Sequence, residues 1–132
     1  MGIAESMEPK LLYFQDRFFS SFDDNDGDDN GLSNMVRKHP SLLTYGIDTN
    51  IEPKIAFFAN EVYGGSKKGE IAALRLAGHD PKFLSYSLEK RLRPRLKEIR
   101  ELGIEQKMSI GSWVKLTPAK WDVFVKRKLG ES

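Results

Sequence analysis

Basic side chains gather in one short stretch of the chain, between residues 90 and 100. They are Lys90, Arg91, Arg93, Lys97 and Arg100. On a helix that starts near Arg93, positions 93, 97 and 100 share one face, and Lys90 and Arg91 lie in the turn before it. Such a cluster suits phosphates, because its charge neutralises a nucleic-acid backbone and releases counterions. Phosphate contacts respond to the shape of the backbone and not to base sequence. The alternative is an ordinary solvated helix face, paired in part with Glu98 and Glu101.

No catalytic or metal-binding set accompanies this cluster. The chain contains no Cys and only two His, which excludes a zinc finger and leaves a poor transition-metal site. Residues 26–31 match the first half of a calcium-binding EF-hand loop, but Arg37 stands where the twelfth position needs a bidentate Glu. The Gly- and Lys-rich segment 64–69 lacks the spacing of a nucleotide-binding P-loop. We therefore expect no enzymatic activity, no cofactor and no bound metal.

Length and composition indicate one small globular chain of 132 residues, with 39% hydrophobic and 30% charged residues. The longest apolar run, residues 55–59, is far shorter than the ~20 residues that span a bilayer, so we expect no membrane association. The charge is uneven. Residues 1–34 hold two basic and eight acidic side chains, whereas residues 35–132 hold 19 basic and 11 acidic ones. This asymmetry favours an anionic partner for the basic part.

The chain is similar to itself at an offset of 41 residues. Residues 40–55 align with residues 81–96, and four of these 16 positions are identical. The identical pairs are Pro40 and Pro81, Leu43 and Leu84, Tyr45 and Tyr86, and Pro53 and Pro94. A partial third copy, residues 8–14, aligns with residues 52–58 at an offset of 44. Repeat periods of 20–50 residues mark solenoids, so these copies predict an all-α fold, an α-solenoid of about two and a half repeats.

Each copy contains a proline, a basic residue and an aliphatic residue in that order, followed by apolar residues at helical spacing. We expect helices from Pro9, Pro53 and Pro94, since proline suits a first helical turn, and we expect Gly103 to end the last of these. By helical phase Arg95 is turned toward the core, so its side chain should bond a neighbouring turn.

Shorter elements separate these helices. We expect a helix over residues 67–77 that Ser66 caps and Gly78 ends, and an abbreviated counterpart over residues 35–38. Short turns should follow at Pro40 and Pro81, a last helix should begin at Pro118, and Trp113 and Trp121 should lie in the core. The expected organisation is an N-terminal helix in residues 1–22, an acidic flexible linker in residues 23–34 and a helical repeat domain in residues 35–132.

The segment from Pro81 to Gly103 resembles the repeat of the mTERF family, the mitochondrial transcription termination factors. It is most similar to the plant organellar branch, in which Pro-x-x-Leu-Ser-Tyr-Ser-Leu-Glu-x-Arg-x-x-Pro-Arg recurs. The resemblance covers residues 32–130, with the Pro9 helix as the tail of a preceding repeat. It implies a superhelix of repeats, each with two antiparallel helices and a short 3₁₀ turn. Family members usually carry more repeats and a transit peptide, and the acidic N-terminal residues of this chain show no transit-peptide pattern.

The resemblance implies an organellar nucleic-acid-binding protein of the mitochondrion or chloroplast. It would bind double-stranded DNA, or RNA, and act in transcription termination and the regulation of organelle gene expression. We expect a monomer whose basic stretch contacts backbone phosphates. The alternative is a helical-repeat module that binds a protein, in which the basic residues only keep the surface soluble. Ionic strength distinguishes the two, because phosphate binding weakens steeply as salt rises.

Overall fold

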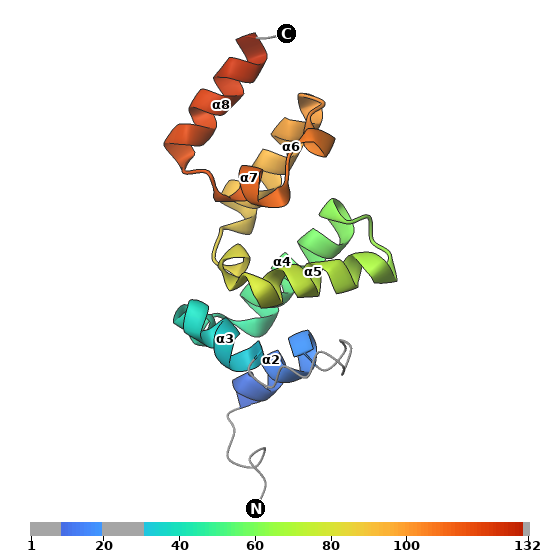
Figure 1. Cartoon of the computed structure of the whole chain (residues 1–132), viewed down its shortest axis with the longest axis vertical. Coiled ribbons are helices and arrows are strands. Elements are labelled where there is room, and N and C mark those ends of the chain that lie inside the picture. Colours follow the sequence, from blue (N-terminus) through green and yellow to red (C-terminus); the bar gives the residue numbers. More distant parts are fainter. Residues whose placement is uncertain (1–8, 20–30, 131–132) are drawn as a thin grey trace, which may run out of the picture. The chain divides into compact units, whose positions relative to one another are not determined.

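The computed structural model describes residues 9–19 and 31–130, and these residues form helices joined by short turns (Figure 1). No strand occurs in these two ranges, so the all-α prediction is confirmed. The α-helices are α2 (Pro9–Phe19), α3 (Gly31–Lys38), α4 (Glu52–Ala56), α5 (Lys67–His79), α6 (Arg93–Glu101), α7 (Ile110–Lys115) and α8 (Pro118–Gly130). The 3₁₀ helices are η2 (Pro40–Thr44), η5 (Pro81–Leu84) and η7 (Glu105–Lys107), and the π-helices are η3 (Ile47–Ile51), η4 (Phe57–Val62) and η6 (Leu88–Leu92).

The chain divides into two compact units, Met1–Ser85 (unit 1) and Tyr86–Ser132 (unit 2). Their boundary falls inside the range 35–132 that we expected to be one repeat domain. Most of the expected acidic linker lies outside the described residues. Its last part, residues 31–34, belongs to α3, which therefore begins four residues before the expected helix start at Met35.

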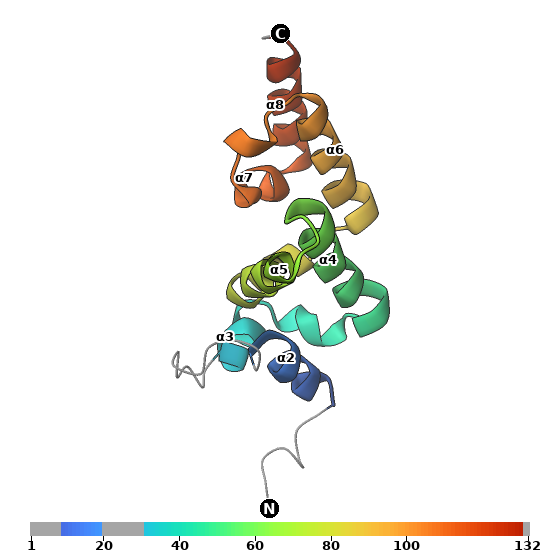
Figure 2. The same cartoon turned by 90° about the vertical axis from the view of Figure 1, so that its right-hand side faces the viewer.

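In unit 1, α5 is the central helix and contacts α2, α3 and α4 (Figures 1 and 2). Ser66 caps α5 as predicted, because its hydroxyl oxygen accepts a hydrogen bond from the Gly69 amide at 3.1 Å. Gly69 itself lies against the end of η4. A Cβ atom at this position would be 2.8 Å from the Ala59 carbonyl oxygen and 2.9 Å from that of Tyr63. Only glycine permits this close approach of the two helical segments.

In unit 2, α6 and α8 lie next to each other (Figure 1), and the Trp121 indole donates a hydrogen bond of 2.8 Å to the Glu98 carboxylate. Trp113 and Trp121 are 2% and 5% exposed, so their predicted place in the core is confirmed. Helix α7, which follows α6 and η7 in the chain and contains Trp113, was not expected from the sequence. Its Trp113 and Val114 side chains are buried, and the helix packs against α6.

Two glycines were expected to end helices, and one of the two expectations is wrong. Gly103 has φ +70° and ends α6 as predicted: its amide bonds the Arg100 carbonyl oxygen, and the Ile104 amide bonds that of Ile99. These two bonds form a Schellman motif. Gly78, in contrast, lies inside α5, which continues to His79. Pro81 explains the later end, because a residue that precedes proline is kept out of the helical region and Asp80 has an extended φ of −134°.

The helices at Pro53 and Pro94 begin earlier than expected, with a π-turn in both copies. The Ile51 amide bonds the Gly46 carbonyl oxygen, five residues back, and the Leu92 amide bonds that of Ser87. These pairs are 41 residues apart, which is the offset of the repeat. In a regular α-helix a proline ring would collide with the carbonyl group four residues before it. The wider turn gives each ring room while the helix continues through it.

The basic residue after each proline binds backbone carbonyl oxygens at the end of the turn that follows it in the chain. Lys10 donates to Leu43 and Tyr45 at 3.0 and 2.9 Å, and Lys54 donates to Leu84 at 2.7 Å. Leu43 and Leu84 are equivalent positions of the repeat, and each lies in a 3₁₀ turn. Both lysines therefore bind the same position in successive copies, which supports the repeat predicted from the sequence.

Arg95 makes the corresponding contacts within unit 2. One of its guanidinium nitrogens lies 2.9, 3.1 and 2.7 Å from the carbonyl oxygens of Trp113, Val114 and Leu116, at the end of α7. The side chain is 4% exposed, and its charge lies 4.8 Å from the centre of the Trp121 ring. The prediction that Arg95 points inward and bonds a neighbouring turn is confirmed. We call these three residues, Lys10, Lys54 and Arg95, the carbonyl clamps.

We expect Arg95→Met to destabilise unit 2 by about 2–6 kcal/mol, because the carbonyl groups of Trp113 and Leu116 lose this donor at a cost of about 1–3 kcal/mol each, whereas Val114 keeps its bond from Arg91. Arg95→Lys, which keeps a charge and a donor, should recover part of this loss. Both tryptophans of the chain lie in unit 2, so denaturant unfolding followed by tryptophan fluorescence measures the effect. Arg93→Met, at an exposed position of the same helix, is the matched control. Equal stability of the two Met variants would contradict the role of the clamp.

We expect Leu84→Ala to reduce the free energy of unfolding by about 2–5 kcal/mol, because the substitution removes buried methyl groups and leaves a cavity. Leu84 is 0% exposed and lies in η5, and its carbonyl oxygen accepts a hydrogen bond from the Lys54 amino group. Urea unfolding followed by circular dichroism measures the loss. Leu129→Ala, at a position that is 59% exposed, should change stability by less than about 0.5 kcal/mol. A loss at Leu84 no larger than that at Leu129 would contradict this packing.

Candidate nucleic-acid interface

Four of the five basic residues predicted to bind phosphate lie at exposed positions along one side of η6 and α6. These four, which we call the α6 stripe, are Lys90, Arg93, Lys97 and Arg100. The opposite side of the same helical segment carries the buried residues Leu92, Leu96 and Ile99. The local sequence produces this division because apolar residues recur three and four positions apart, with basic residues between them. Ser87 begins the segment, and its hydroxyl oxygen accepts the Lys90 amide at 3.0 Å.

Arg91, the fifth predicted residue, has a different environment. It is half-buried, and its guanidinium group lies 4.6 Å from the centre of the Tyr86 ring. It also donates a hydrogen bond of 3.2 Å to the Val114 carbonyl oxygen, so it reaches the same end of α7 as Arg95. Burial, together with the nearby charge of Arg91, lowers the pKa of Arg95. Arg91 and Arg95 thus direct their charges toward the backbone of unit 2.

The two arginines of the α6 stripe form ion pairs. Arg93 lies 2.9 Å from the carboxylate of Glu89, one turn earlier. Arg100 binds the Glu105 carboxylate with two nitrogens, at 2.8 and 3.2 Å. Neither lysine has such a partner: within the described ranges no carboxylate oxygen lies within 4.0 Å of the amino group of Lys90 or Lys97.

The spacing of the α6 stripe suits a phosphate backbone. At 1.5 Å per residue, the distance along the helix from residue 90 to residue 100 is about 15 Å. One DNA strand presents a phosphate for each ~3.4 Å of the duplex axis, so about four phosphates occur over this length. Unit 2 has twelve basic and six acidic residues, and the four cations of the stripe thus lie on a unit with an excess of positive charge.

A second polar cluster lies in unit 1, and no local sequence pattern predicts it because its members come from three separate helices. Arg17 of α2 pairs with Glu52 of α4 at 2.9 Å and with Glu70 of α5 at 3.4 Å. The Tyr13 hydroxyl also donates a hydrogen bond to Glu52. Arg17, Glu52 and Glu70 line a pocket of about 410 Å³ together with the apolar side chain of Ile55. Arg17 thus links α2 to α4 and to α5, which makes the cluster a structural connection between helices.

Burial and hydrogen bonding shift the pKa values in this cluster. Burial alone would raise the pKa of Glu52, but the hydrogen bonds from Arg17 and Tyr13 and the charge of Arg17 outweigh it, so the pKa lies below its ordinary value. Burial, followed by the hydrogen bond to Glu52, raises the pKa of Tyr13. Outside the cluster, burial lowers the pKa of the carbonyl clamp Lys54.

In the described residues no group of three His, Cys, Asp or Glu side chains could hold a metal ion.

The lowered pKa of Glu52 predicts a pH dependence of stability. The stabilisation from the ionised carboxylate is complete above the ordinary Glu pKa and disappears as the pH falls through the lowered folded-state value. We expect wild type to be more stable than Glu52→Gln by about 1 kcal/mol near neutral pH, a small value because the pair is partly exposed. The difference should vanish below that lowered pKa. Urea unfolding of both proteins from pH 7 to pH 2, followed by circular dichroism, tests this, and a constant difference would contradict it.

The chain matches the model of a known protein family. The family model for mTERF matches residues 4–122, which is most of the chain. No curated protein and no solved structure matches it. Members of the matched family are generally non-catalytic nucleic-acid-binding proteins and typically organellar. No helix in the described part of this chain is long and apolar enough to cross a membrane. The extent of the match, together with the repeated proline-led helices, shows that the chain belongs to the mTERF family.

Proposed function

We propose that this protein binds nucleic acid through backbone phosphates, with the α6 stripe as the contact surface. The observation that carries the proposal is the alignment of four exposed cations on one side of a single helical segment. These side chains suit sequence-independent binding, since Lys and Arg neutralise phosphates regardless of the base that each phosphate belongs to. Double-stranded DNA is the expected ligand, and the phosphates of RNA offer the same chemistry.

Arg91 takes a supporting part in this proposal. Because it binds the Val114 carbonyl oxygen and lies over the Tyr86 ring, its charge reaches a ligand only over a longer distance than the charges of the stripe. Family membership supports a place of action in the mitochondrion or chloroplast. It also supports a role in transcription termination and the regulation of organelle gene expression, without catalysis. We expect the protein to act as a monomer.

The test is the triple substitution Arg93→Ala, Lys97→Ala and Arg100→Ala. Affinity for duplex DNA of unrelated sequences should fall alike for all of them, because the side chains that are removed carry no base information. The slope of log K against log salt should also become shallower by about 0.9 for each phosphate that is no longer bound. Fluorescence anisotropy of labelled duplexes at several salt concentrations measures both quantities. Stability should hardly change, since the three positions are exposed.

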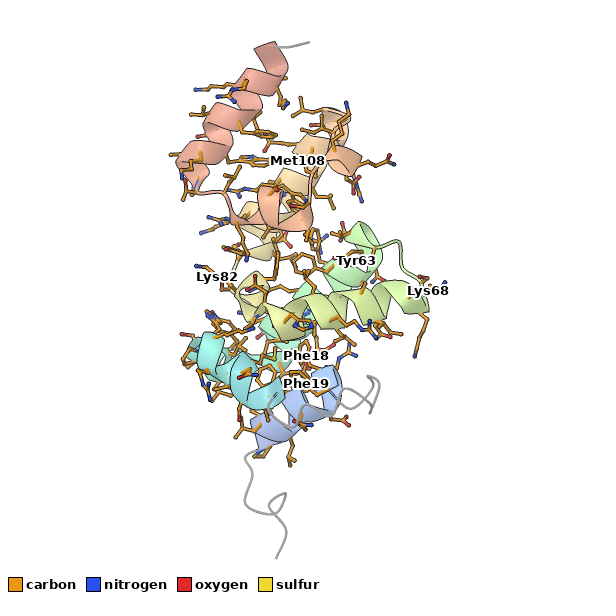
Figure 3. All side chains as sticks on the ribbon, viewed as in Figure 1. Phe18, Phe19, Tyr63, Lys68, Lys82 and Met108 are labelled. Atoms are coloured by element: carbon orange, nitrogen blue, oxygen red, sulfur yellow. The ribbon has the colours of Figure 1, made fainter. Side chains whose placement is uncertain are left out.

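The matched control replaces Lys67, Lys68 and Lys82 with Ala. These three lysines are exposed on unit 1, where Figure 3 labels Lys68 and Lys82, and their removal changes the net charge by the same amount. The control should keep the affinity and salt slope of wild type. Equal losses in both triple variants would show that total charge, and not the α6 stripe, determines binding. Wild-type affinity in the stripe variant would reject the interface and favour a protein-binding module.

A further inference from the structure

Two carboxylates of the chain itself occupy the two arginines of the α6 stripe. Glu89 precedes the stripe's arginines in η6 and pairs with Arg93 at 2.9 Å. Glu105 follows them in η7 and binds Arg100 through two nitrogens, at 2.8 and 3.2 Å. A carboxylate that receives a guanidinium fork in this way uses the geometry by which a phosphate would receive it. The Glu105 carboxylate therefore stands where a phosphate would bind Arg100, and the Glu89 carboxylate binds one nitrogen of Arg93 through the same kind of charge-assisted contact.

The ends and the middle of the stripe differ in this respect. Glu105 lies outside α6, beyond the helix end that Gly103 makes, so it reaches Arg100 because the Schellman motif turns the chain back. Lys97, between the two arginines, has no carboxylate within 4.0 Å in the described ranges. The side chains of Arg93 and Arg100 are each 44% exposed, so solvent and ligands reach both pairs.

We infer that Glu89 and Glu105 compete with phosphates for the arginines of the α6 stripe and thereby lower its affinity for nucleic acid. This inference rests on the proposed function of the stripe. Exposed ion pairs are weak in water, so a dense row of phosphates displaces them when several phosphates bind together. A single phosphate binds too few cations to do so. The carboxylates thus make the stripe selective for a polyanionic backbone over mononucleotides and inorganic phosphate.

The experiment compares wild type with Glu89→Gln, Glu105→Gln and the double variant, all as the full chain. Gln keeps the size of Glu but removes its charge. On a 20-base-pair duplex at 0.1 M salt, each substitution should raise affinity by about three- to tenfold, because no ion pair has to open before the duplex binds. The salt slope should change by less than about 0.9, since the duplex binds the same cations in both proteins. Competition by inorganic phosphate should also become measurable in the double variant. Fluorescence anisotropy measures all three quantities, and tryptophan fluorescence confirms that the variants are folded.

The control is Asp48→Asn combined with Asp122→Asn, which removes two exposed carboxylates that lie outside η6, α6 and η7. An equal rise in affinity in this control would overturn the inference, because total charge would then explain the effect. Weaker binding by the Gln variants would also overturn it and would show that the carboxylates orient the arginines. Unchanged affinity would overturn it while the proposed function stands. No binding by wild type or by any variant at low salt would instead reject the proposed function.

Discussion

The cation that follows each helix-leading proline is the contact on which the rest of this structure depends. Proline suits a helix start but donates no hydrogen bond, and the 3₁₀ turn or short helix later in the chain ends with carbonyl groups that have no helical partner. Lys10, Lys54 and Arg95 supply the missing donors at these ends. Burying a charge is unfavourable unless it is hydrogen-bonded, so each clamp fixes the turn in one place against its helix. The same two-residue signal thus gives both the start of a helix and the position of the next element.

In unit 2 the clamp also determines which basic residues face outward. Arg95 can reach the end of α7 only if α6 presents that side to the core, and Leu96 and Ile99 then become buried beside it. Once this phase is fixed, positions 93, 97 and 100 must lie on the exposed side. The buried cation and the exposed cations are therefore not independent features. The packing of unit 2 produces the charged surface of α6 as a consequence.

Local signals in the sequence were sufficient for much of this arrangement. The order proline, basic residue, aliphatic residue predicted the helices, and the 3.6-residue period placed Arg95 inside and Lys97 outside. Arg91 was expected in a turn before the helix, but the helical segment already includes it, and four positions before Arg95 it lies on the same side as that buried residue. Helix α7 and the contact of Glu105 with Arg100 arise where the chain turns back after the end of α6. Periodicity within one helix carries no information about such returns.

Net charge is consequently a poor measure of the surface that a polyanion meets on this protein. Unit 2 holds twelve basic residues, yet Arg91 and Arg95 direct their charges to backbone carbonyl groups, and Arg93 and Arg100 face carboxylates. A cation that already has a partner contributes less to the free energy of ligand binding, since its ion pair must open before the ligand binds. The electrostatics of the α6 stripe therefore follow from the helix phase, which the contact of Arg95 with the end of α7 fixes, and from the places of two glutamates. Glu89 lies one turn before Arg93, and the turn at Gly103 brings Glu105 to Arg100.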